Sequence, residues 1–117
     1  MARTVLIVDD HPGFRASARR MLEAGGFEVA GEVADGASAR RVNRQLHPDV
    51  ILLDVQLPDA DGIELAGELS GTDGHPSVVL CSSRTAEELG AGLDSSGALG
   101  FVPKDELTVA SVVELLP

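Results

Sequence analysis

Carboxylates follow two short apolar segments of the chain. Asp9 and Asp10 come directly after the run 5–8, and Asp54 comes directly after the run 50–53. Taken singly, each aspartate is more typical of a turn or a helix cap than of a ligand site. Two apolar runs that both end in aspartate point instead to a shared site for a cation.

Two further polar groups stand at comparable places. Ser82 follows the apolar run 78–81, and Lys104 stands just beyond the run 99–102. Uninterrupted apolar runs of strand length predict strands that are buried on both faces, and therefore a parallel sheet with helices on each side. The C-terminal ends of parallel strands share one edge of the sheet, where ligands bind in open α/β folds.

Helical patterns separate these runs, so the sequence repeats a strand–helix unit five times. A less apolar strand is expected at 27–33, and helices are expected at 13–25, 37–46 and 62–70, from Thr85 to a stop at Gly97, and from a cap at Asp105 to about Leu116. The predicted fold class is α/β, flavodoxin-like, with five parallel strands in the order 2-1-3-4-5 and helices on both faces. In this order the first and third strands are neighbours, so the three aspartates converge.

Three converging carboxylates repel one another unless a cation or a proton neutralises them. A like-charge pair at about 4 Å costs roughly 4 kcal/mol at an effective dielectric constant of about 20. Oxygen ligands with room for water suit Mg²⁺ or Mn²⁺, and no histidine or cysteine stands at a zinc-like spacing. We therefore expect a divalent cation at Asp9, Asp10 and Asp54.

The composition limits the class of protein. The 117 residues, 44% of them hydrophobic, suffice for one domain, and a single cysteine, Cys81, excludes an internal disulfide. The N-terminus lacks the long apolar run of a signal peptide or a membrane span, so a cytoplasmic protein without membrane association is expected. The net charge of −10 argues against direct binding of nucleic acid by this domain.

These motifs together resemble those of response-regulator receiver domains of two-component systems, chemotaxis receivers included. Residues 5–11, Val-Leu-Ile-Val-Asp-Asp-His, are similar to the opening of the family, and residues 54–62, with Leu-Pro and a final Gly, are similar to its phosphoacceptor loop. Ser82 and Lys104 follow at intervals similar to those of the family. The resemblance covers nearly the whole chain, so residues 1–117 are expected to form one receiver domain.

The resemblance implies a role for each acidic residue. Asp54 would be the phosphoacceptor, which attacks a phosphohistidine in a magnesium-dependent reaction. Asp10, Asp54 and the backbone carbonyl of Gln56 would hold the cation directly, and Asp9 would act through water. The expected partners are a sensor histidine kinase or phosphotransfer protein and, on phosphorylation, a second copy of the chain.

The remaining roles concern the response to phosphorylation. Lys104 and the hydroxyl of Ser82 would bind phosphoryl oxygens and move toward the new charge. Phe101, three residues before the lysine, stands where the family has a buried switch aromatic, although a residue of the core alone is the other interpretation. A phenylalanine lacks the hydroxyl that a tyrosine at this position provides.

Two departures from the common family pattern bear on the output. Lys104 is followed by Asp105 where proline is frequent, and Ser82 stands in place of threonine. Both features resemble the branch that carries a LuxR-type helix-turn-helix output domain. Two options therefore stay open: the N-terminal receiver of a DNA-binding transcription regulator, or a stand-alone phosphorelay protein.

Other classes of protein fit the sequence less well. A magnesium-dependent phosphatase with an aspartate nucleophile usually has a second aspartate two residues later, where this chain has Gln56. A nucleotide-binding protein would need a glycine-rich phosphate loop, which the sequence lacks. A receiver that no longer accepts phosphate would have lost an acidic or lysine position, and none is missing. The chain is expected to be a signalling domain that catalyses only its own phosphorylation and dephosphorylation.

Overall fold

Strands and helices alternate along the chain in the computed structural model, which describes residues 2–93 and 95–117. The strands are β1 (Thr4–Val8), β2 (Glu28–Val33), β3 (Val50–Asp54), β4 (Ser77–Ser82) and β5 (Gly100–Pro103); the helices are α1 (Pro12–Ala24), α2 (Gly36–Leu46), α3 (Gly62–Ser70), α4 (Ala86–Leu89) and α5 (Val109–Leu115), with short 3₁₀ turns η1 (Ala91–Leu93) and η2 (Lys104–Glu106). All pairings between these strands are parallel, in the order β2-β1-β3-β4-β5. The predicted fold class is confirmed.

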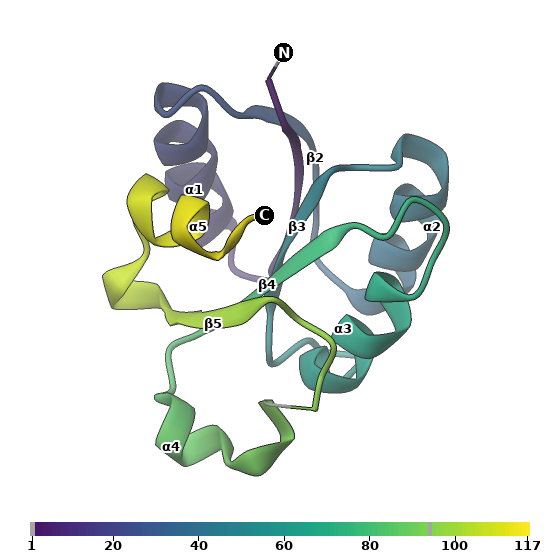
Figure 1. The fold of residues 1–117 in the computed structure, drawn as a ribbon, viewed down its shortest axis with the longest axis vertical. Coiled ribbons are helices and arrows are strands. Elements are labelled where there is room, and N and C mark those ends of the chain that lie inside the picture. The colour runs from purple at the N-terminus through teal and green to yellow at the C-terminus, as the bar shows by residue number, and fades with distance from the viewer. Residues whose placement is uncertain (1, 94) are drawn as a thin grey trace.

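The sheet has two apolar faces, each covered by its own helices. Val5 and Ile7 of β1 lie in a core with α1 and α5, whereas Leu6 and Val8 lie in a core with α2 and α3. Figure 1 shows α1 and α5 on one side of the sheet and α2 and α3 on the other. Burial on both faces explains why the inner strands read as continuous apolar runs.

Local signals set the ends of the middle helices. The carboxylate of Asp35 caps α2 by accepting a hydrogen bond from the Ser38 N–H, and α2 stops at His47, which adopts a left-handed conformation (φ 46°) just before Pro48. The helix expected at 37–46 thus ends where the sequence predicted, just before His47. A capping residue at one end and a left-handed residue before proline at the other are common helix boundaries.

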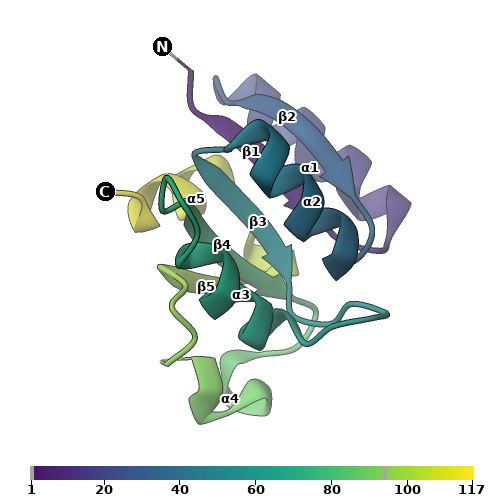
Figure 2. The same cartoon turned by 90° about the vertical axis from the view of Figure 1, so that its right-hand side faces the viewer.

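The fourth helix is shorter than the sequence predicted. Thr85 and Glu88 form the expected capping box, but α4 ends at Leu89 because Gly90 has a positive φ of 83°. The predicted continuation to Gly97 is therefore wrong. Figure 2 shows α4 at one end of the molecule, beyond α3 and β5.

The last helix begins later than the sequence predicted. Asp105 does not cap it, because residues 104–106 form the separate turn η2. Instead, Thr108 caps α5: the Ser111 N–H donates to Thr108 Oγ1 at 3.0 Å, and the Thr108 N–H donates to Ser111 Oγ at 2.9 Å. These reciprocal bonds are those of a capping box, with serine in place of the usual glutamate.

None of the helices within residues 2–93 and 95–117 combines the length and the apolar character that crossing a bilayer requires.

Candidate functional site

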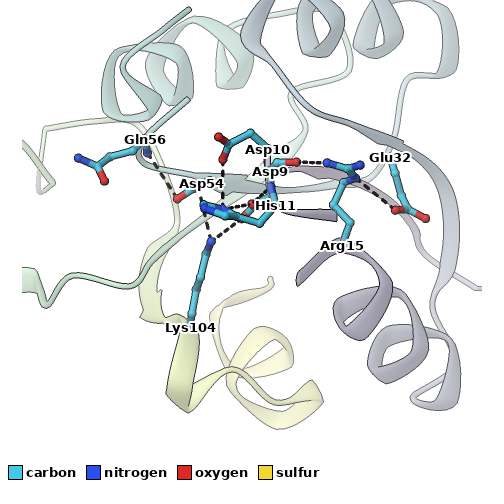
Figure 3. Close-up of polar contacts among 8 residues, drawn as sticks. All are labelled: Asp9, Asp10, His11, Arg15, Glu32, Asp54, Gln56 and Lys104. Atoms are coloured by element: carbon cyan, nitrogen blue, oxygen red, sulfur yellow. Dashed lines mark hydrogen bonds and ion pairs between the residues drawn. The ribbon is translucent and has the colours of Figure 1, made fainter. Parts of the chain in front are cut away.

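The register of β1 and β3 brings the acidic residues together. Val8 pairs with Leu53, so Asp9 and Asp54 leave neighbouring strands at the same edge of the sheet. One ligand atom from each of Asp9, Asp10, His11 and Asp54 lies within 4.8 Å of the others. Figure 3 shows these side chains converging, with Lys104 approaching from below.

Lys104 brings the positive charge to this cluster. It begins η2 directly after β5, and its Nζ lies 2.7 Å from Asp9 Oδ2 and 3.7 Å from Asp54 Oδ2. Nζ also lies 4.4 Å from the centroid of the Phe14 ring, a cation–π contact. Burial acts to lower the pKa of Lys104, but the hydrogen bond to Asp9 and the charge of Asp54 outweigh it, so the pKa is raised and the ammonium stays charged.

The Asp54 carboxyl is in an unfavourable environment for a negative charge. Only 3% of the residue is exposed, and burial is the largest cause of its raised pKa. The neighbouring Asp9 raises the pKa further, and the attraction of Lys104 offsets only part of this effect. The three aspartates together outnumber the single ammonium, so a second cation would be stabilised here.

Asp9 is fully buried, and its two oxygens have different surroundings. Oδ1 accepts a hydrogen bond from the backbone N–H of His11 at 2.8 Å. Oδ2 faces the Lys104 ammonium, whose Nζ lies 2.7 Å away. The carboxylate oxygens gathered here are the ligands that a hard divalent cation such as Mg²⁺ prefers.

Ser82 and Gln56 lie at the edge of this cluster. Cys81 pairs with Asp54, which puts Ser82 one residue beyond the level of Asp54. The buried hydroxyl of Ser82 accepts the Arg84 N–H at 3.0 Å. In the described chain it makes no hydrogen bond to Asp54 or Lys104. The backbone N–H of Gln56 donates to Asp54 Oδ1 at 3.4 Å, a long hydrogen bond.

Phe101 lies in the core on the α3 side of the sheet. It is partly buried and packs against the same core cluster as Leu89 of α4 and Leu93 of η1. This core cluster therefore borders β5 as well as the short α4 and η1 segments. This location agrees with both interpretations of Phe101, as a core residue and as a mobile aromatic.

Arg15 supports the acidic pair from α1, a contact that the sequence analysis missed. Its Nη1 donates to the backbone carbonyl of Asp9 at 2.6 Å, and its Nε lies 3.5 Å from Glu32 Oε1 on β2 (Figure 3). Arg15 thus connects the loop after β1 to the neighbouring edge strand. Its position one helical turn after His11 is the signal that would have placed it on this side of α1.

Asp59 is a second residue that the sequence analysis missed. Its two carboxylate oxygens accept the N–H groups of Gly36 at 2.7 Å and Ala37 at 3.0 Å, at the start of α2. These hydrogen bonds lower the pKa of Asp59. The loop between β3 and α3, which begins after Asp54, is thereby attached to another helix.

Gly62 allows the same loop to fold back on its strand. A Cβ at this position would lie 2.2 Å from the carbonyl oxygen of Asp54 and 2.6 Å from the Cα of Val55. The Gly62 N–H donates to the Val55 carbonyl at 2.7 Å. Contact of this kind leaves no room for a side chain.

Cys81 lies in the core behind the site and takes no part in its polar contacts. The thiol is 1% exposed, and burial is the main cause of its strongly raised pKa, with a smaller contribution from Asp54. Cys81 is thus a residue of the hydrophobic core.

Comparisons with known proteins show which family has this arrangement. The model of the response regulator receiver domain matches residues 5–114. The chain is 30% identical over 104 residues to the chemotaxis protein CheY of Thermotoga maritima, covering 89% of this chain and 87% of that protein. The solved structure of a LuxR-family two-component response regulator from Aurantimonas sp. SI85-9A1 has a TM-score of 0.86 and 29% identity, with 97% of this chain and 84% of that chain covered.

The chain therefore belongs to the response regulator receiver domain family. It is also 34% identical over 106 residues to the transcription regulator BvgA of Bordetella pertussis, covering 91% of this chain and 51% of that protein. The chain spans about half the length of BvgA and of a similar transcriptional regulator from Pseudomonas aeruginosa.

Proposed function

We propose that this receiver domain accepts a phosphoryl group on Asp54 from a sensor histidine kinase or a phosphotransfer protein. The observation that carries the proposal is the buried Asp54 carboxylate beside two further aspartates and one ammonium at the C-terminal edge of the sheet. Phosphoryl transfer depends mainly on positioning the acceptor and neutralising the phosphoryl oxygens, and these groups suit both tasks. The domain is a signalling module that catalyses only its own phosphorylation and dephosphorylation.

The carboxylates suit a bound Mg²⁺ or Mn²⁺. Asp10, Asp54 and the backbone carbonyl of Gln56 would hold the ion directly, and Asp9 would hold it through water. When bound, the cation supplies positive charge opposite the transferring phosphoryl oxygens.

Lys104 and Asp54 have complementary tasks in this reaction. The ionised Asp54 carboxylate, held at the end of β3, attacks the phosphorus of the donor's phosphohistidine without a general base. As the new P–O bond forms, the P–N bond breaks and the donor's imidazole leaves. Lys104 neutralises a phosphoryl oxygen. Because its ammonium contacts Asp9 more closely than Asp54 before the reaction, this contact must lengthen as the lysine turns to the new charge.

The response to phosphorylation starts from Ser82 and Lys104. The Ser82 hydroxyl, which now accepts the Arg84 N–H, donates to a phosphoryl oxygen and draws the loop after β4 inward. Phe101 follows because it packs against the same core cluster as Leu89 of α4. The changed surface forms contacts with a second copy of the chain or with an output domain.

Two outputs agree with these features. The Lys104–Asp105 pair and the likeness to BvgA and LuxR-family proteins favour the receiver part of a transcription regulator in the cytoplasm, in which a separate domain, not this acidic one, binds DNA. The likeness to CheY favours a stand-alone phosphorelay protein. The length of the complete reading frame distinguishes the two.

Acetyl phosphate provides a direct test of the phosphoacceptor. We expect the wild-type protein with Mg²⁺ to gain the mass of one phosphoryl group in intact-mass spectrometry, and we expect EDTA to prevent the gain. The Asp54→Asn variant should gain nothing, because it lacks the nucleophile. Asp73→Asn, in the exposed loop before β4, is the matched control and should behave as wild type. An unchanged mass of the wild-type protein would contradict the proposal.

A further inference from the structure

His11 has an unusual position at the start of α1. It is the N-cap residue, yet its side chain makes no capping hydrogen bond to the helix. Its ring instead turns toward the acidic pair: Nδ1 lies 2.9 Å from Asp9 Oδ1 and 3.1 Å from Asp10 Oδ1 (Figure 3). The ring therefore adds a nitrogen to the group of oxygens that the proposed cation would use.

The backbone holds this nitrogen in place. The His11 N–H donates to Asp9 Oδ1, and Pro12, with its fixed φ, follows as the first residue of α1. Arg15 donates to the carbonyl of Asp9 and fixes the same turn from the other side. Hydrogen bonds thus hold the main chain at Asp9 and at His11, on either side of Asp10. They fix the position from which the His11 ring extends.

The spacing of His11 and Asp10 is that of neighbouring ligands on one ion. In an octahedral site with ligands at about 2.1 Å, adjacent ligand atoms lie about 3.0 Å apart. Nδ1 of His11 lies 3.1 Å from Oδ1 of Asp10, the carboxylate proposed to hold the ion directly. His11 also belongs, with Asp9, Asp10 and Asp54, to the group whose ligand atoms all lie within 4.8 Å of one another.

We propose that His11 is an additional ligand of the cation site and that it shifts the preference of the site from Mg²⁺ toward transition-metal ions such as Mn²⁺ and Co²⁺. Imidazole nitrogen is a common ligand for transition metals, whereas Mg²⁺ prefers oxygen. The inference rests on the cation site of the proposed function. His11 should strengthen the binding of Co²⁺ more than that of Mn²⁺, because the affinity of divalent ions for nitrogen ligands rises from Mn²⁺ to Co²⁺.

The competing interpretation of these contacts is an ion pair between a protonated imidazole and the two carboxylates. An ion pair would oppose the binding of every divalent cation alike, since the cation and the imidazolium compete for the same oxygens. A ligand role instead predicts selective support for transition metals. Comparing Mg²⁺ with transition-metal ions separates the two roles.

Calorimetric titration of the metal-free protein tests selectivity. We expect His11→Phe, which keeps a ring but removes both nitrogens, to weaken Co²⁺ binding roughly tenfold or more and to change Mg²⁺ binding less than about threefold. His75→Phe, in an exposed loop, is the matched control and should leave both affinities unchanged. Equal weakening of both ions, or stronger binding of both, would overturn the inference.

Pulsed electron paramagnetic resonance gives a readout that does not depend on affinity. Mn²⁺ in the wild-type and His75→Phe proteins should show coupling to an imidazole nitrogen, and this coupling should vanish in His11→Phe. Bound Mn²⁺ without nitrogen coupling in the wild-type protein would refute the role of His11 while leaving the phosphoacceptor proposal intact. Failure of the wild-type protein to bind any of the three cations would instead overturn both proposals.

Discussion

Asp54 carries a negative charge that its surroundings disfavour. Burial and the nearby Asp9 raise its pKa in the folded protein, so the folded state retains a proton at pH values where the unfolded chain has lost it. In the metal-free protein the free energy of unfolding therefore falls as pH rises from the ordinary carboxyl pKa through the raised pKa of Asp54. The Lys104 ammonium offsets part of this unfavourable charge, and the proposed cation would offset more of it.

Replacing Asp54 by asparagine should remove this cost. We expect Asp54→Asn in EDTA to raise the free energy of unfolding by roughly 1–2 kcal/mol near neutral pH, within the range of like charges at close distance. This gain in the free energy of unfolding should shrink below the ordinary carboxyl pKa of about 4, because there Asp54 is protonated in both the folded and the unfolded protein. Urea unfolding across this pH range measures it, with Asp73→Asn as the control. A gain that does not vary with pH would show that packing, not charge, is responsible.

The residues of this site differ in how far the sequence predicts them. Asp9, Asp10, Asp54 and Lys104 were placed near one another because each follows an apolar strand at the same edge. The contacts of Arg15 and Asp59, given above, depend on the rotation of a helix and on the path of a loop. Strand-end spacing carries no information about either, so these two contacts were not predicted.

At the scale of elements, the connection from β3 to α3 is the most tightly constrained segment near the site. Asp59 attaches it to α2, and Gly62 brings it against the backbone of β3. The loop that contains Gln56 is therefore fixed at two points beyond the acceptor. Fixed positions of this kind reduce the motion needed to reach the reactive geometry.

A side chain at Gly62 should disrupt this connection. We expect Gly62→Ala to lower the free energy of unfolding by about 2–3 kcal/mol, because the added Cβ would overlap with backbone atoms that cannot move independently. Gly13→Ala in α1, where nothing lies within 4 Å of the added Cβ, should instead raise it by about 0.5–1 kcal/mol. Urea denaturation of both variants measures the contrast, and similar effects at the two glycines would contradict it.

Helix ends show where sequence reasoning about elements succeeds and where it fails. The strands and the stop at His47 were predicted because buried runs and residues before proline have strong preferences. The start of α5 was missed because the pattern at Thr108 ends in serine, and because Asp105 also looks like a cap. Only the three-dimensional path after Lys104, which turns as η2, decides between two such candidates.

The whole molecule consists of one sheet with unequal coverage. Helices α1, α2, α3 and α5 all bury side chains against the sheet, whereas the four-residue α4 has no buried residue. Residues 83–89, which end with α4, are thus a part of the described chain that can move at low energetic cost. They begin beside Ser82, and Leu89 packs against the same core cluster as Phe101, so motion there is coupled to the site.

Phosphorylation should therefore change this end of the molecule first. We expect phosphorylated wild-type protein to show amide NMR shifts in residues 82–93 and at Phe101, with small changes in α1 and α2. Lys104→Ala should retain part of the phosphorylation but lose these shifts, because the ammonium that follows the phosphoryl group is absent. Lys104→Arg keeps the charge and serves as the control. Normal shifts in the alanine variant would exclude Lys104 as the origin of the response.

The burial of Cys81 has a practical consequence for work on this domain. The chain has one thiol, and in the folded state this thiol is both inaccessible and held in its unreactive protonated form. A maleimide reagent can modify it only in molecules whose β4 has separated from its neighbours. The speed of alkylation thus reports how often the sheet opens, without any engineered label, and any ion that tightens the folded state will slow it.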